Sequence, residues 1–460
     1  MNRLKLAALL FVLGAVTGVI NAQTDTVYKF TLPQAQDFAI NNFFVSKNAA
    51  LDIESAQKKI WETTAIGLPQ VSGKVDYTYM PDIPEMSFPQ TIMGANKGNN
   101  EPIVGGDFRD PNFYSMVPGE PFKMGVTNNV SYSLMLTQLI FSGEYIVGLQ
   151  ASRIYKLFAV ENYDKVKINI RESIASSYYA ILILKENKVV LEETLKNLKM
   201  NYEYTKKFYE QGLVEDTDVD QLQLTVKRTE NSLRTIENQI QYLSKLFKYQ
   251  IGIEADTRVE FLDSIAMLLK INIIEPTNYK FNLDEHIDYK LLTTQEDLQS
   301  LSLNREKSTF LPTVSGFYQY KDQFKNPAFN MNIKHIIGVS LSMPIVSSGM
   351  RLAKVGQAKI ELDKASNMKE QEALRLTLTA QQSMFDYNTA LANYYNESDN
   401  ITLSEKVLKK ATIRFKEGMV SSLELSIFNN QYLQAQLTYA TAIQELLTKK
   451  IALDKAFSKL

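Results

Sequence analysis

The chain contains no cysteine among its 460 residues. Disulfide bonds and thiolate metal sites are therefore excluded. The chain also lacks an excess of either charge, because 50 lysine and arginine residues balance 51 aspartate and glutamate residues. Most proteins that bind nucleic acid present a strongly basic surface, so a nucleic-acid partner is not expected.

Histidine is nearly absent, with only His286 and His335 in the whole chain. Each is isolated in its sequence neighbourhood, and the chain has no phosphate-binding loop and no nucleophile elbow. The carboxylates are scattered and lie mainly on expected helical faces, where solvation is the ordinary role of a charge. The sequence therefore does not predict an enzyme, and no metal or other cofactor is expected.

Long apolar runs are missing, except at the N-terminus. There, Arg3 and Lys5 precede the apolar segment Leu6–Ile20, and a small-residue cleavage site ends at Ala22. This pattern predicts a secretory signal peptide over residues 1–22, and an N-terminal transmembrane helix is the alternative. No later run reaches the roughly 18 apolar residues that a spanning helix needs. We expect an exported protein without such a helix.

Proline is absent between Pro121 and Pro276, and again after Pro344. Because proline interrupts helix interiors, its absence permits very long helices in these two stretches. Within them, Gly212 is the only glycine between Leu149 and Ile251, and Gly418 is the only glycine between Gln357 and Leu460. The sequence thus predicts two long helical hairpins, each with a single glycine at its turn.

The helices after these glycines show the period of coiled-coil packing. Apolar residues recur at alternating steps of four and three, which predicts one buried seam on each helix. The first seam comprises Leu222, Val226, Thr229, Leu233, Ile236, Ile240, Leu243 and Phe247. The second comprises Phe428, Tyr432, Ala435, Tyr439, Ala442 and Leu446.

The chain repeats one pattern twice. "LPQVSG" at residues 68–73 corresponds to "LPTVSG" at residues 311–316, and each begins a run of alternating residues. A second alternating run then ends in Ser-Gly, at Gly143 and at Gly349. The turn glycine follows 69 residues later in both halves, at Gly212 and at Gly418. The order strand, strand, long helical hairpin therefore occurs twice.

The alternating runs predict four strands, at about residues 70–80, 128–140, 312–322 and 335–345. One face of each run is apolar and the other carries small or charged residues, with tyrosines toward the strand ends. Such runs of nine to eleven residues are typical of an outer-membrane barrel, and an ordinary half-buried sheet in a soluble domain is the alternative. Four strands cannot close around a water-filled pore, so several copies must share one barrel.

These features together resemble the TolC-like outer-membrane efflux protein family. The resemblance rests on "TLPQAQDFAINN" (Thr31–Asn42) as an opening helix, the two Leu-Pro strand entries, the two Ser-Gly exits and the two glycine turns, in the family's order. It implies a mixed α and β membrane protein: a homotrimer with a 12-strand transmembrane barrel, continued by a long periplasmic α-helical barrel. The expected location is the outer membrane, with a large periplasmic part.

The resemblance also implies a function. Channels of this family receive substrates from an inner-membrane pump, through a periplasmic adaptor protein, in tripartite efflux or type I secretion systems. Substrates then leave passively across the periplasm and the outer membrane. The expected partners are accordingly two further copies of the chain, an adaptor, a pump and outer-membrane lipid. The pump selects the substrate, so this sequence does not identify the exported molecule.

The domain layout follows the two repeats. After the signal peptide, residues 23–252 form the first repeat. Residues 253–460 contain a linking, equatorial segment and then the second repeat. A periplasmic coiled-coil adaptor is the alternative function, since it shares a signal peptide and long hairpins. An adaptor normally has one hairpin flanked by compact β-domains rather than this duplicated pattern.

The two turns carry the candidate functional residues. Gly212 and Gly418 are expected at the periplasmic tip, where Asp218 and Glu424, six positions later, resemble the family's acidic ring at the tunnel entrance. Acids in a first helical turn also complement the helix dipole, which is the simpler interpretation. Ser421 fits a helix N-cap with Glu424 as its capping-box partner, and Asp216 or Thr217 is expected to cap the other helix. The expected adaptor-docking residues are Leu213, Val214, Met419 and Val420.

Overall fold

The computed structural model describes residues 27–87, 89–93, 114–273, 279–326 and 332–460. The expected signal peptide, residues 1–22, lies outside these ranges. The described chain divides into two compact units, which are treated separately below. One comprises Met1–Glu54, Phe158–Thr293 and Asn367–Leu460, and the other Ser55–Leu157 and Thr294–Ser366.

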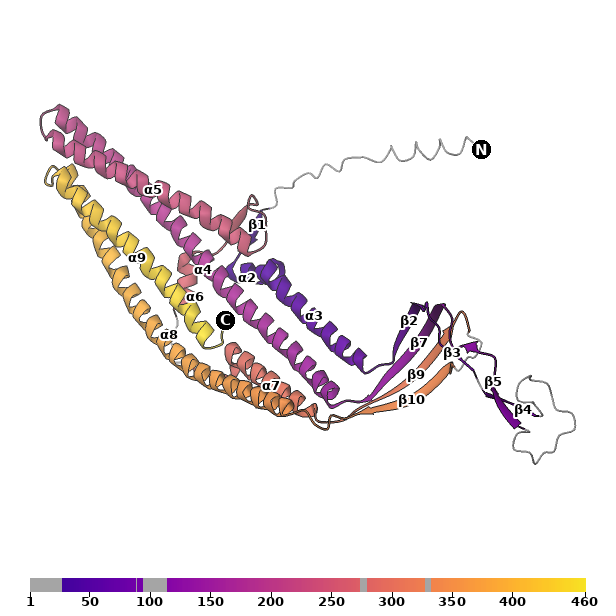
Figure 1. The fold of residues 1–460 in the computed structure, drawn as a ribbon. Coiled ribbons are helices and arrows are strands. Elements are labelled where there is room, and N and C mark those ends of the chain that lie inside the picture. Colours follow the sequence, from indigo (N-terminus) through magenta and orange to yellow (C-terminus); the bar gives the residue numbers. More distant parts are fainter. Residues whose placement is uncertain (1–26, 88, 94–113, 274–278, 327–331) are drawn as a thin grey trace, which may run out of the picture. The chain divides into compact units, whose positions relative to one another are not determined.

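The second unit contains a four-stranded antiparallel sheet, whose strands lie side by side in Figure 1 in the order β10-β9-β7-β2. Its strands are β2 (Gln70–Tyr79), β7 (Asn128–Phe141), β9 (Thr313–Gln323) and β10 (His335–Ser342). They coincide with the four alternating runs of the sequence. Strands from the two repeats meet at the centre, where β7 pairs with β9. A bulge between Leu139 and Phe141 shifts this pairing close to the point where the chain leaves the sheet.

Short strands extend the connection between β2 and β7. β3 (Glu85–Met86) pairs with β6 (Phe122–Lys123), and β4 (Pro89–Met93) pairs with β5 (Tyr114–Pro118). The prolines in this connection prevent a regular helix, so a narrow ribbon of strands is a structure that they permit.

Two long helical hairpins follow the strands, as the absence of proline predicted. The first joins α4 (Gly143–Glu210) to α5 (Asp216–Gln250), and the second joins α8 (Met350–Lys416) to α9 (Ser422–Ala456). At 1.5 Å per residue, α4 and α8, of 68 and 67 residues, are each about 100 Å long. The helices α3 (Phe44–Ile66) and α7 (Ile287–Ser308) each precede the first strand of a repeat.

The predicted seams are buried or half-buried in both hairpins. In the first hairpin, Leu195 and Leu198 of α4 pack with Val226 of α5. In the second, Phe415 of α8 packs with Leu425 of α9. Packing along one stripe of each helix therefore stabilises helices of this length, which intrinsic propensity alone would not. No helix among the described residues has the length and apolar character needed to cross a membrane.

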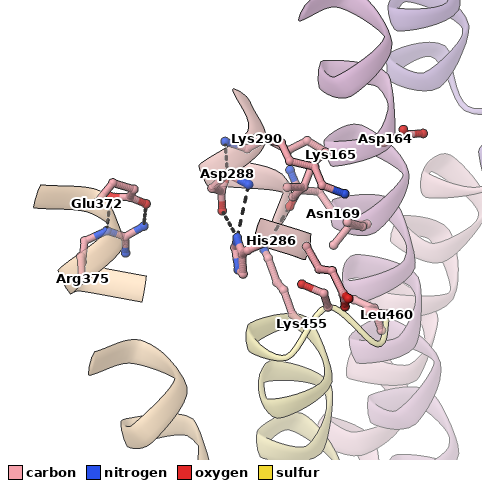
Figure 2. A pocket seen from close by; sticks show the side chains of 14 residues that line it. Asp164, Lys165, Asn169, His286, Asp288, Lys290, Glu372, Arg375, Lys455 and Leu460 are labelled. Carbon is pink, nitrogen blue, oxygen red and sulfur yellow. Dashed lines mark hydrogen bonds and ion pairs between the residues drawn. The ribbon is translucent and has the colours of Figure 1, made fainter. Parts of the chain in front are cut away.

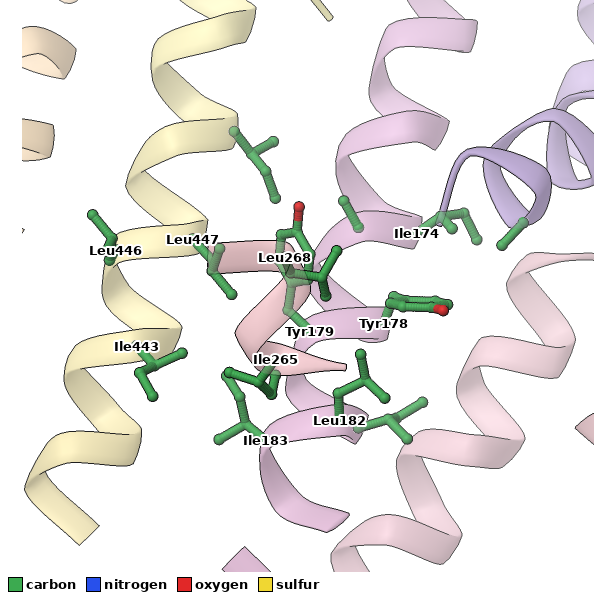
Figure 3. Close-up of a cluster of buried hydrophobic side chains, with 14 of the residues drawn as sticks. Ile174, Tyr178, Tyr179, Leu182, Ile183, Ile265, Leu268, Ile443, Leu446 and Leu447 are labelled. Carbon is green, nitrogen blue, oxygen red and sulfur yellow. The ribbon is translucent and has the colours of Figure 1, made fainter. Parts of the chain in front are cut away.

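A large hydrophobic core lies in the first unit, where α4, α6 (Ile265–Asn272) and α9 meet (Figure 3). Tyr178 of α4 is fully buried, and its hydroxyl oxygen lies 2.9 Å from two acceptors for its single proton, the Phe30 carbonyl and the Asp263 carboxylate. Phe30 is the last residue of β1 (Tyr28–Phe30), and Asp263 follows β8 (Val259–Phe261). The strands β1 and β8 pair in parallel. The opening helix α2 (Leu32–Asn42) begins beside them, at the position expected from the sequence.

Candidate functional site

The two glycine turns have the same backbone geometry. Gly212 and Gly418 have φ angles of +70° and +72°, a region that glycine enters without steric cost. The Gly212 N–H donates to the Tyr209 carbonyl at 2.8 Å, and the Leu213 N–H donates to the Phe208 carbonyl at 2.9 Å. This is the Schellman arrangement, and the second turn repeats it. Both turns lie at the same end of the helical unit (Figure 1).

The helices restart differently after the two turns. Ser421 caps α9, because its Oγ accepts the Glu424 N–H at 3.2 Å. Among the described residues Glu424 does not return a bond to Ser421, so the capping box is half formed. The expectation that Asp216 or Thr217 caps α5 is wrong. Both residues already lie inside the first helical turn, and the N-cap is Glu215, which makes no side-chain cap hydrogen bond.

The candidate acids lie in equivalent first turns. Asp218 is half-buried near the start of α5, and Glu424 is exposed near the start of α9. Within the described ranges, neither carboxylate forms an ion pair with a basic side chain. Their charges are therefore not neutralised by a neighbouring base and can complement the helix dipole.

The apolar residues of the turns fall into two groups. Leu213 and Met419 are 67% and 69% exposed, whereas Val214 and Val420 are half-buried. Val420 packs against the cluster of Phe415 and Leu425 at the α8–α9 contact. Each turn thus has one exposed apolar side chain, next to a half-buried valine.

A second site, which the sequence did not reveal, surrounds His286. A pocket of about 480 Å³ lies between α4, the start of α7, α8 and α9 (Figure 2). His286 is only 5% exposed, and its Nδ1 accepts the Asp288 N–H at 3.2 Å. Lys165 of α4 pairs with the Asp288 carboxylate at 2.7 Å, and Glu372 pairs with Arg375 along α8.

These contacts limit what the pocket can do. The charges beside the histidine are largely satisfied by their neighbours, which removes the free groups that an acid–base reaction would use. Among the described residues there is also no group of three or more metal-binding side chains. Burial lowers the pKa of His286, so the ring is held in its neutral form. The arrangement is that of a packed, neutral histidine inside a network of paired charges.

The lowered pKa of His286 predicts a pH-dependent stability. The unfolded chain binds the imidazole proton more readily than the folded chain does. The stabilisation is therefore complete above the ordinary pKa of about 6.5 and is lost as the pH falls through the folded-state pKa. We expect the thermal unfolding midpoint to fall less between pH 7.5 and 5.5 in His286→Asn, which keeps an acceptor for the Asp288 N–H. Parallel pH profiles for the two proteins, followed by circular dichroism, would contradict this.

The sequence matches a family model described as outer membrane efflux protein, over residues 117–244 and 302–458. The match covers nearly all of both long hairpins and the strands β7, β9 and β10, and it leaves out β2. This chain belongs to the outer membrane efflux protein family. A search of curated proteins found no match.

Solved structures of such channels share the fold. VceC of Vibrio cholerae aligns with a TM-score of 0.68 at 15% identity, covering 93% of this chain and 95% of VceC. CmeC of Campylobacter jejuni aligns at 0.69 and 16%, covering 93% and 85%. The open state of MtrE of Neisseria gonorrhoeae aligns at 0.67 and 13%, covering 93% and 88%. At these identities the comparison establishes the fold alone.

Membership of the outer membrane efflux protein family decides between the two functions expected from the sequence. The protein is an outer-membrane channel for efflux, and the alternative of a periplasmic adaptor is wrong. The family consists of channel proteins rather than enzymes. The resemblance to TolC-like channels, which rested on matched spacing of strands and turns, is confirmed.

Proposed function

We propose that three copies of this chain form one channel: a 12-strand barrel in the outer membrane, continued by an α-helical tunnel through the periplasm. The observation that carries this proposal is the four-stranded sheet, which ends in two edge strands, β2 and β10. Exposed edges of this length attract further strands. Pairing β10 of one copy with β2 of the next, three times, closes a barrel wide enough for a lumen.

The register of the sheet supports a lipid-facing surface. Leu136 of β7 lies between Val71 of β2 and Tyr318 of β9, and Tyr318 is paired with Ile337 of β10. One face of all four strands is thus apolar in a continuous row. Exposed side chains on this face include Val71, Val75, Tyr77, Leu134, Ile337, Val339 and Leu341. A large exposed apolar face is costly in water and favourable in lipid.

The rest of the chain follows from that placement. We assign residues 1–22 to a signal peptide, residues 23–252 to the first repeat, and residues 253–460 to the linking segment and second repeat. The helical hairpins form the periplasmic part. The turns at Gly212 and Gly418 form its tip, where an adaptor protein docks against Leu213, Val214, Met419 and Val420. The high exposure of Leu213 and Met419 supports this role. An inner-membrane pump delivers the substrate.

The acids Asp218 and Glu424 form carboxylate rings at the tip in such a trimer. Their lack of ion pairs among the described residues supports this assignment, since three copies of each acid then concentrate negative charge at a narrow entrance. A ring of this kind favours cations over anions.

Single-channel recording in a planar bilayer tests the proposal. We expect wild-type trimers to form cation-preferring pores, and Asp218→Asn with Glu424→Gln to lose most of that preference at unchanged pore frequency. The matched control is Glu254→Gln with Asp256→Asn, which removes two exposed acids beyond the other end of α5.

Each outcome of that recording has a separate meaning. Unchanged selectivity in the tip variant would reduce both acids to helix-dipole partners and leave the channel in place. An equal loss of cation preference in the control variant would mean that the selectivity depends on the overall charge of the protein and not on the acids at the tip. A protein that is not trimeric and forms no pores would overturn the proposed assembly.

A further inference from the structure

A second pocket lies where the strands of the sheet meet the long helices. It has a volume of about 380 Å³ and is lined by the start of β9, the end of β10, the end of α7 and the starts of α4 and α8. Four charged side chains line it: Glu144, Glu306, Arg351 and Lys354. All four belong to the same compact unit. The pocket therefore holds two negative and two positive groups.

The four charged side chains of this pocket are not paired with one another. In the part of the chain that the structure describes, none of the four side chains forms an ion pair or a side-chain hydrogen bond. Glu306 and Arg351 are nevertheless half-buried, where an unpaired charge is less well solvated than at an open surface. The pocket around His286 differs, because its charges are paired within the chain. Unpaired charges of both signs in one cavity indicate a ligand that carries both.

The strand register places this pocket on the polar face of the sheet. Thr313 of β9 is paired with Ser342 of β10, and both line the pocket. The next pair, Val314 with Leu341, belongs to the apolar face. Because side chains alternate along a strand, Thr313 and Ser342 point to the opposite face. In the proposed barrel that face lines the lumen.

We propose that this pocket binds a small zwitterionic solute, with one carboxylate and one ammonium group, on its way through the channel. Arg351 and Lys354 bind the carboxylate, and Glu306 and Glu144 bind the ammonium group. Charge-assisted hydrogen bonds of this kind are stronger than neutral ones, so both ends of the solute contribute to selection. The inference rests on the proposed channel, because only that assembly makes the polar face a lumen wall.

Blockade of single-channel current by triglycine tests the inference. Triglycine carries both charges, whereas the N-acetylated and amidated peptide carries neither. We expect triglycine alone to interrupt the wild-type current. In Glu306→Gln with Arg351→Gln, the half-blocking concentration is expected to rise at least about tenfold, since each lost charge-assisted bond weakens binding by about that factor.

The control is Glu361→Gln with Lys364→Gln, an exposed ion pair farther along α8 at 2.7 Å. Like the pocket variant, it removes one charge of each sign, and we expect wild-type blockade. Two results would contradict the binding site and leave the proposed channel unaffected. One is equal blockade of the wild type by both peptides, and the other is equal blockade of the pocket variant and the wild type by triglycine. Loss of trimers in the pocket variant alone, seen by gel filtration, would overturn the site by making these charges subunit contacts. Absence of any wild-type pore would instead contradict the proposed function.

Discussion

Leu134→Arg is expected to prevent assembly in the outer membrane, whereas Met135→Arg in the next position is expected to assemble. Leu134 lies near the middle of β7, on the apolar face, and is 52% exposed. In the proposed barrel this face meets lipid, where an arginine near the middle of the bilayer costs about 2–4 kcal/mol, and the proposed trimer carries that cost three times. Met135 points to the polar face, between Ser72 and Gln319, where a charged side chain meets water.

The measurement is the amount of heat-resistant trimer in the outer-membrane fraction, compared on a gel with the wild type. The two substitutions are well matched, because each replaces a flexible apolar residue by arginine in the same strand. We expect at least a tenfold difference between them, corresponding to a free-energy difference above about 1.4 kcal/mol. Equal assembly of the two variants would mean that the apolar face does not meet lipid.

The sheet and the turns are the parts of this fold that the sequence predicts best. The reason is that both depend on local patterns. Period-two alternation locates a strand wherever one face is apolar, and a lone glycine in a long helical stretch locates a turn that needs positive φ. The four strands lie where the alternating runs are, and Gly212 and Gly418 adopt that conformation. Duplication of the pattern strengthened both predictions.

Details that depend on contacts distant in sequence were not predictable in this way. The N-cap at Glu215 differs from the expected Asp216 or Thr217 because several polar residues follow the turn, and the exact start of the helix depends on how the hairpin packs. His286 stood alone in the sequence, yet helices α4, α8 and α9 bring charged residues around it. Pairing of β7 with β9 likewise joins the two repeats, which no local pattern encodes.

The two pockets show how the same residue types serve different purposes. Around His286, Lys165 of α4 pairs with Asp288 of α7, which fixes these two helices against one another, and Glu372 pairs with Arg375 within α8. At the strand ends, acids and bases line one cavity and form no ion pair with any residue that the structure describes. Since a paired charge is held by its partner and an unpaired one is available to a ligand, the difference in pairing separates a structural role from a binding role.

Asp454→Ala is expected to lower the free energy of unfolding by about 3 kcal/mol or more. Lys450 of α9 is only 5% exposed, and its ammonium group lies 2.6 Å from the Asp454 carboxylate and 2.9 Å from the Tyr279 hydroxyl. Tyr279 in turn donates to Asp454 at 2.6 Å. Loss of the carboxylate leaves a buried ammonium group whose only neighbour in this network is a phenol.

The reverse substitution, Lys450→Met, is expected to cost less, because the Asp454 side chain is 20% exposed and keeps some contact with water. The double variant Lys450→Met with Asp454→Leu is expected to recover most of the loss, since it leaves no unpaired charge inside the protein. Glu361→Ala, which breaks an exposed pair on α8, is the control and is expected to change stability by less than about 0.5 kcal/mol. Chemical denaturation of the four variants measures their free energies of unfolding and so tests the expected order of stability. If Asp454→Ala proved no more damaging than Glu361→Ala, the buried ammonium group would have to be solvated, and the linking segment at Tyr279 would not be anchored to α9 through this network.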